Sequence, residues 1–254
     1  MNIGTKEIDR KVDETEGRAR VLTGWQLQLV ALVAFIWSLF QLWYASPLPF
    51  IVGFGVLIDV PARAIHLGFA LFLTFLSFPF LKRDRRKKFG LINFCLAIVA
   101  FFCTFYLFYN YEALVYRNGV LLTHEINIFG RQFNFPTELI LGMVGILLLL
   151  ESTRRAIGTP LVIVALIFLL YSIFGQSMPE MISHQGLSLK RLVGYHWFGG
   201  EAIFGIPISV SVSFVFLFVL FGSMLDFAGG GRYFLSLALA LVGKFRGGPA
   251  KASI

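Results

Sequence analysis

The sequence predicts an all-α integral membrane protein with about six transmembrane helices. Of its 254 residues, 57% are hydrophobic and 14% are charged, whereas a soluble domain is about 45–50% apolar and about 25% charged. The apolar residues form runs long enough to cross roughly 30 Å of hydrocarbon. The basic residues fall in the gaps between these runs. The net charge of +8 therefore indicates membrane topology and argues against a nucleic-acid partner.

A basic loop at residues 82–88, with the sequence KRDRRKK, separates two long uncharged runs. Each Lys or Arg in hydrocarbon costs about 2.5–3.5 kcal/mol, so this loop must face water, and short basic loops stay in the cytoplasm. With the loop inside, 17 of the 22 Lys and Arg residues are cytoplasmic. We therefore expect a cytoplasmic N-terminus, with residues 1–22 as a tail. The topology-determining side chains of the loop are Lys82, Arg83, Arg85, Arg86, Lys87 and Lys88.

The first predicted span is residues 24–45, with Trp25 at its inner end and Trp43 and Tyr44 at its outer end, as interfacial aromatic residues require. Residues 50–58 are apolar but too short to span. We expect them to form a re-entrant or surface-lying segment outside the membrane.

Residues 64–81 and 89–110 are the second and third predicted spans. Asp59, Arg63 and His66 precede and enter the second at spacings of four and three. These spacings place them on one helix face, where an ion pair at the mouth of the span is expected. A docking or relay site is the functional alternative.

An external loop with turns at 117–119 and 129–131 is predicted for residues 111–136. The fourth span, 136–153, has Glu138 and Glu151 near its ends, and Gly142 and Gly145 let a neighbouring helix approach closely. Arg154 and Arg155 then anchor the helix on the inside. We expect Glu151 to pair with only one of these arginines at a time; a transport site is the alternative role.

The sequence Gly158-Thr159-Pro160 predicts a tight return, with Gly158 after one helix, Thr159 as N-cap and Pro160 at the first helical position. Residues 160–175 form the fifth span and 204–225 the sixth, which the glycines at 229–231 end. Residues 233–242 are apolar but only long enough for a half-length or interfacial helix. Residues 176–203 are external. Within them a short helix is expected to lie in the membrane interface, anchored by Tyr195 and Trp197, from the recurrence of Leu189, Leu192, Val193, His196 and Trp197.

Catalytic and cofactor-binding patterns are not found in the sequence. Cys95 and Cys103 are eight residues apart, about 12 Å along a helix, which is too far for a disulfide. No Cys/His cluster has zinc-ligand spacing, and the triple glycine lacks the Lys-Ser/Thr of a phosphate-binding loop. We therefore expect no catalytic residue, no metal, no cofactor and no enzymatic activity. A membrane-embedded enzyme is the least favoured alternative.

The C-terminal third resembles the opening of the large membrane subunit of tripartite ATP-independent periplasmic (TRAP) transporters. The resemblance lies in GIPISV at 205–210, in FVFLFVLFGSMLDFAGGGRYF and in LALALVGKFRGGPAK, with residues 246–251 the most specific piece. LLLLESTRRAIG at 147–158, Tyr171 and Gly175 resemble the subgroup in which small and large subunits are fused and the partner is a TAXI-type binding protein. The resemblance covers roughly residues 20–254.

This resemblance implies a domain order. Residues 23–155 correspond to a four-helix small-subunit domain, 156–203 to a connector helix and external interfacial segment, and 204–254 to the start of the large permease domain. The family continues beyond the point matching residue 254 into hairpins that hold substrate and sodium. We therefore expect an N-terminal portion with a scaffold role and without substrate-binding residues. The alternative is a stand-alone scaffold or assembly subunit that pairs with a separately encoded remainder.

The function that the resemblance implies is sodium-coupled symport of organic acids (carboxylates) across the bacterial inner membrane. The partners it implies are a periplasmic TAXI-type binding protein, the remainder of the large subunit and the lipid bilayer. Residues 46–63, 111–135 and 176–203 are the external surfaces expected to meet the binding protein.

The first prediction concerns topology. In a cysteine-free background, a single cysteine replacing Asn118 should react with an impermeant thiol reagent added outside the cell, and one replacing Arg86 should not, because the charge asymmetry places the two on opposite sides. Labelling measured in intact and in permeabilised cells checks this. External labelling at Arg86 but not at Asn118 would overturn the orientation.

Overall fold

The computed structural model describes residues 19–20, 22–80, 89–117, 120–128 and 131–242. Apart from one short hairpin, the regular secondary structure of these residues is helical, so the all-α membrane fold is confirmed. The chain divides into two compact units, Met1–Ser209 and Val210–Ile254, and each is described by itself. The helices are α2 (Trp25–Ala45), α3 (Leu48–Val52), α4 (Asp59–Ser77), α5 (Leu91–Tyr116), α6 (Thr137–Ala156), α7 (Thr159–Ile173), α8 (Leu189–Val193), α9 (Ile206–Val210), α10 (Phe216–Phe227) and α11 (Gly230–Val242).

Short elements complete the described chain. Two 3₁₀ turns, η1 (Gly175–Ser177) and η2 (Glu180–Ile182), follow α7. Two π-helical turns occur, η3 (Gly194–Phe198) after α8 and η4 (Ser211–Val215) between α9 and α10. Strands β1 (His124–Ile128) and β2 (Arg131–Phe135) pair antiparallel, with His124 opposite Phe135 and Ile128 opposite Arg131.

Four helical stretches in the described residues are long and apolar enough to cross a membrane: α2, α4, α5 and Ile206–Phe227. Helix α6 has 20 residues but is charged near both ends, and α7 has 15. At 1.5 Å per residue, α7 reaches only about 22 Å unless its ends are extended by neighbouring residues. The count of six spans therefore stays a prediction.

Several helix boundaries differ by a few residues from those predicted, and three of them illustrate local causes. Helix α4 begins at Asp59, not at 64, because an acidic residue in a first turn is stabilised by the helix dipole. Helix α5 continues to Tyr116, where the Arg117 side chain donates to the Ala113 carbonyl. Thr159 is already helical, so the residue that precedes α7 is Gly158, one position earlier than expected.

The β-hairpin lies within residues 111–136, where an irregular loop was predicted. Both strands carry apolar residues at every second position, as a strand with two different faces requires. These positions are Ile126 and Ile128 in β1, and Phe133 and Phe135 in β2. The predicted turn at 129–131 falls between the paired residues Ile128 and Arg131. The two strands were not predicted, because the prediction used turn residues alone and overlooked this short alternation.

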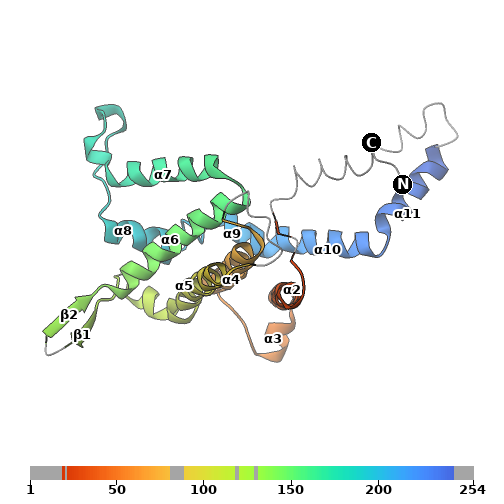
Figure 1. Ribbon diagram of the computed structural model, residues 1–254, viewed down its shortest axis with the longest axis horizontal. Helices are drawn as coiled ribbons and strands as arrows, with labels where there is room; N and C mark the ends of the chain where they lie inside the picture. The colour runs from red at the N-terminus through yellow and green to blue at the C-terminus, as the bar shows by residue number, and fades with distance from the viewer. Residues whose placement is uncertain (1–18, 21, 81–88, 118–119, 129–130, 243–254) are drawn as a thin grey trace. The chain divides into compact units, whose positions relative to one another are not determined.

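Helices α4 and α5 lie side by side at the centre of the first unit (Figure 1). Their contact uses small residues: Ala64, Ala97 and Ala100 are fully buried. A Cβ atom on Gly68 would meet the Thr104 hydroxyl at 2.5 Å. Small side chains let the two backbones approach, which is the usual basis of helix packing in membranes.

Helix α2 packs against this pair through a few polar contacts and through rings such as Trp37 on Phe69, and its other face is exposed. The Gln26 side chain donates to the Phe89 carbonyl at 3.2 Å and accepts from the Phe89 N–H at 2.9 Å. Further along, the Trp37 indole donates to His66 Nδ1 at 3.3 Å. Large apolar side chains such as Phe35 and Leu39 are left uncovered, as expected for a helix that faces lipid.

The segment after α7 returns to α6 and fills a notch made by two glycines. Trp197 is fully buried. Any Cβ on Gly145 would collide with its indole ring, and one on Gly142 would collide with Val193 and Phe198. The Trp197 N–H has no hydrogen-bond partner among the described residues, so apolar packing holds the ring. We name this contact the glycine notch.

The predicted interfacial helix at 189–197 therefore packs part of its apolar face on protein, and its placement at the membrane interface stays a prediction. Leu192, Val193 and Trp197 are buried, and α8 and η3 contact α6. Trp197 is not a lipid anchor; Tyr195, at 52% exposure, remains on the surface. The spacing of apolar residues at three and four positions does form one helical face. That face packs on protein, because α6 offers a complementary notch.

In the second unit, α10 ends at Phe227, and Gly229 adopts a left-handed conformation (φ 83°) before α11 begins. A side chain at this φ would be strained. The glycine run thus breaks the helix where the sequence indicated.

The second prediction concerns the glycine notch. Gly145→Leu should destabilise the purified protein by about 1–3 kcal/mol, because the added side chain must displace a buried ring. Thermal unfolding in detergent measures this. The matched control is Gly222→Ala in α10, where nothing lies within 4 Å of the added methyl and helix propensity improves. Equal unfolding temperatures for the two variants would contradict the notch.

Candidate functional site

Glu138, in the first turn of α6, is fully buried and surrounded by hydrogen-bond donors. Its carboxylate accepts from Arg117 Nη1 at 3.1 Å and Nη2 at 2.8 Å. It also accepts from the Tyr106 hydroxyl at 3.0 Å and from the Leu122 N–H at 2.6 Å. We name these residues the Glu138 cluster. It joins the end of α5, the following loop and the start of α6.

The chemistry of the Glu138 cluster is structural. A carboxylate that already holds a bidentate arginine and two more donors has little remaining capacity to bind a further cation or proton. Removing Arg117 would instead leave an uncompensated buried charge. Sequence reasoning noted Glu138 but missed Arg117 as its partner, since the two are 21 positions apart and only the helix packing brings them together.

A second cluster lies at the opposite end of α6. Glu151 Oε1 accepts from Arg155 Nε at 2.7 Å and from Arg154 Nη2 at 2.8 Å, and Oε2 accepts from Arg154 Nε at 2.8 Å. The expectation that Glu151 pairs with one arginine at a time was wrong. Two carboxylate oxygens near the end of one helix accept both guanidinium groups at once. We name this the Arg155 cluster.

The Arg155 cluster also ties α6 to its neighbours. Arg155, whose side chain is 1% exposed, donates to Asn93 Oδ1 at 3.0 Å and lies over the Phe75 ring at 4.8 Å. Arg154 donates to the Phe80 carbonyl at 3.0 Å and covers the Phe80 ring. The end of α4, the start of α5 and the end of α6 thereby meet through one set of charges. Phe80 is two positions before the first residue of the basic loop, Lys82.

Lys82, Arg83, Arg85, Arg86, Lys87 and Lys88 lie outside the described residues. The same holds for the tail residues 1–18 and for residues 246–251. Their predicted roles stay predictions.

Asp59 and Arg63 come together at the start of α4, with Arg63 Nη2 at 2.8 Å from Asp59 Oδ2. The other guanidinium nitrogen, Nη1, donates to the Phe204 carbonyl at 2.8 Å. His66 lies one turn further on, is buried, and contacts Trp37 of α2. Arg63 therefore bonds the start of α4 to the segment that leads into α9, while His66 faces the neighbouring helix.

His184 forms a corner in the segment that follows α7, which sequence reasoning missed. Its Nε2 lies 3.0 Å from the Tyr171 carbonyl, and its Nδ1 accepts from the Gly186 N–H at 3.1 Å. The ring covers Gly175, where a Cβ would collide with it. Gly186 has a positive φ of 69°. The paired glycines around a histidine were the available signal, since such positions often mark a close approach of backbone to a ring.

These ion pairs and hydrogen bonds connect the helices of the first unit to one another. In the described residues, no group of three or more His, Cys, Asp and Glu side chains converges as metal ligands. Cys95 is exposed, Cys103 is buried, and both are free thiols. The described carboxylates of α6 are each occupied by arginine.

The third prediction separates the two arginines of the Arg155 cluster. Arg155→Ala should destabilise the protein by about 2–3 kcal/mol, because it removes the buried donor to Asn93 and the more buried of the two arginines that pair with Glu151. Arg154→Ala, at a more exposed position, should cost below about 1 kcal/mol. Replacing both should lower the amount of protein inserted in the membrane. Membrane yield and unfolding temperature are the measurements; normal yield with lost uptake would indicate a transport site.

Comparison with known proteins shows that the C-terminal part of the chain matches a family model. Residues 144–254 match the family model described as tripartite ATP-independent periplasmic transporter, DctM component. The match covers less than half of the chain and begins inside α6, upstream of residue 204. No curated protein and no solved structure matched the chain. The family match supports a TRAP-type membrane permease component.

Proposed function

We propose that this chain is a membrane component of a sodium-coupled TRAP permease that takes up organic acids delivered by a periplasmic binding protein of the TAXI type. The observation that carries the proposal is the DctM match over residues 144–254. In the proposed domain order, residues 23–155 act as the small-subunit domain, 156–203 as the connector and 204–254 as the start of the large permease domain.

The proposed role of residues up to Ser209 is a static scaffold. Its support is the position of the charged contacts, which brace both ends of α6 and are fully used in doing so. Alternating access needs a fixed body against which a substrate-carrying part moves. Helices joined by small-residue packing and saturated ion pairs suit that fixed body.

The surface proposed to meet the binding protein is the exposed face of α8 and η3. Leu192, Val193 and Trp197 face α6, so Lys190, Arg191 and Tyr195 are exposed. The glycine notch holds this face rigidly, which lowers the entropic cost of docking. In the proposed orientation, with a cytoplasmic N-terminus in the bacterial inner membrane, this face is periplasmic.

The fourth prediction tests this function in proteoliposomes that contain the chain, the other membrane components of its transporter and the purified binding protein. Labelled carboxylates should accumulate only with an inward sodium gradient and only when the binding protein is present. Accumulation that needs ATP, or that proceeds without the binding protein, would contradict the proposal.

A charge-reversal variant tests the docking face in the same assay. Lys190→Glu with Arg191→Glu should raise the binding-protein concentration needed for half-maximal uptake, because rim charges steer association. Arg232→Glu in α11 is the matched control and should leave that concentration unchanged, since in the proposed orientation the residues after the sixth span are cytoplasmic. Equal effects of both variants would argue against the α8 face.

A further inference from the structure

The segment between α2 and α4 forms an uncharged, exposed apolar surface. From Pro47 to Ile58 it contains no charged or hydrogen-bonding side chain. Its large side chains point outward: Phe50 is 73% exposed, Phe54 74% and Ile51 74%. An apolar surface of this extent, left in water, would be a strong liability for association.

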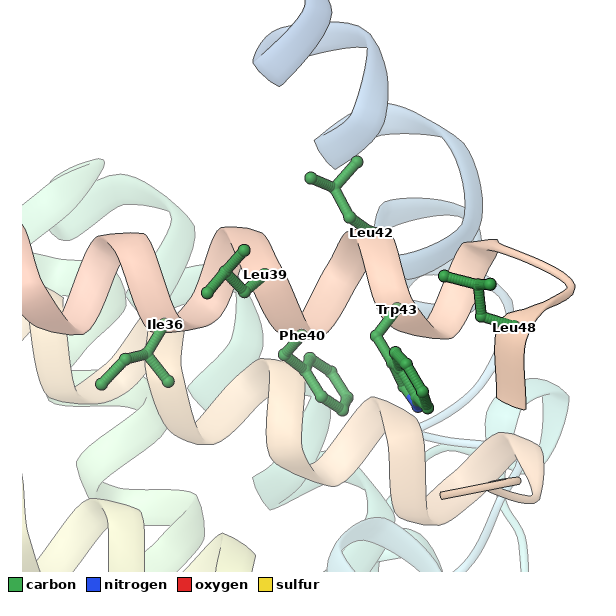
Figure 2. Close-up of a pocket in the computed structure, with 6 residues that line it drawn as sticks. All are labelled: Ile36, Leu39, Phe40, Leu42, Trp43 and Leu48. Carbon is green, nitrogen blue, oxygen red and sulfur yellow. The ribbon is translucent and has the colours of Figure 1, made fainter. Parts of the chain in front are cut away.

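An open apolar groove runs from α2 onto this segment. It is lined by Ile36, Leu39, Phe40, Leu42, Trp43 and Leu48, which Figure 2 shows along the end of α2 and the start of α3. The groove therefore continues the exposed face of α2, which already includes Phe35 and Leu39. Because α2 is long and apolar enough to span a membrane, that face contacts acyl chains, and the groove continues the same lipid-facing surface.

The backbone limits how deep this segment can lie. Helix α3 has only five residues, and the N–H groups of Phe54, Gly55, Val56 and Leu57 form no hydrogen bond within the described residues. Unpaired N–H groups do not occur in lipid-exposed hydrocarbon, where each costs several kcal/mol. The segment must therefore remain where water or lipid headgroups can bond its backbone.

Two observations indicate the depth of the segment in the bilayer. A Cβ on Gly55, which has φ 70°, would lie 2.9 Å from Trp43 Nε1, so the loop packs against the last turn of α2. At its other end the segment leads into the exposed carboxylate of Asp59. Tryptophan at a helix end and a charged residue are both typical of the headgroup level.

We propose that residues 48–58 lie flat in the bilayer interface, with Phe50, Ile51 and Phe54 inserted among the upper acyl chains and the backbone at headgroup level. The occupant of the groove is then lipid. This assigns residues 48–58 to the membrane surface and not to the binding protein. It rests on α2 and α4 crossing the membrane, and it does not depend on the proposed transport function.

The fifth prediction uses single cysteines labelled with an environment-sensitive fluorophore in proteoliposomes, with Cys95 and Cys103 replaced by Ala. Labels at Phe50 and Phe54 should emit at shorter wavelength than a label at Glu180, an exposed external position. Nitroxide lipids labelled near the headgroup end of the acyl chain should quench them more than lipids labelled near the methyl end. Phe35→Cys in the middle of α2 is the control for depth, with the opposite order of quenching.

Three results would overturn the interfacial placement. Stronger quenching of Phe50 and Phe54 by the deep nitroxide would indicate a re-entrant loop. Quenching by aqueous iodide equal to that at Glu180 would place the segment in water. Iodide quenching that disappears only on adding the binding protein, or only at high protein-to-lipid ratio, would identify a protein partner or a second copy. Failure of uptake would change none of these readings.

Discussion

The pairing of the charges on α6 is the constraint on which the rest of the first unit depends. Helix α6 carries a glutamate in its first turn and a glutamate with two arginines near its end. A helix with unpaired charges at both ends cannot face lipid along its length. It must lie where other elements supply partners, and α4, α5, α7, α8 and η3 all contact it. The small-residue packing of α4 on α5 then positions those partners.

Helix α6 is held by two kinds of contact, one at its ends and one in its middle. At its ends, directional charged hydrogen bonds fix register, because a guanidinium fork accepts only a narrow range of positions. In its middle, Gly142 and Gly145 give shape complementarity without polarity. In the predicted fourth span, charged residues near the ends and small residues in the middle agree with the cost of polar groups, which is highest at mid-membrane. The arrangement is one of support.

The sequence predicted the features that depend on neighbouring residues, and it failed for contacts between residues far apart in the chain. Long apolar runs predicted the helices, because hydrophobic length reports a local property. The glycine break after Phe227 was also local. The placement of Trp197 was wrong because a helical apolar face packs equally well on lipid or on protein, and only the partner surface decides. Arg117 as the partner of Glu138, the double pairing of Glu151 and the His184 corner depend on segments far apart in sequence. The hairpin was not predicted, because the prediction rested on two turn sequences and the alternation of apolar residues in the strands is short.

The glycine notch also constrains which substitutions this chain can accept during evolution. The ring of Trp197 occupies the space that a side chain at Gly145 would need, so a larger residue at 145 fits only if residue 197 becomes smaller. A cavity left by a smaller residue at 197 is in turn filled by a larger one at 145. Related chains that keep this contact are therefore bound to exchange the two positions together, and correlated substitution between 145 and 197 becomes the evolutionary trace of the notch.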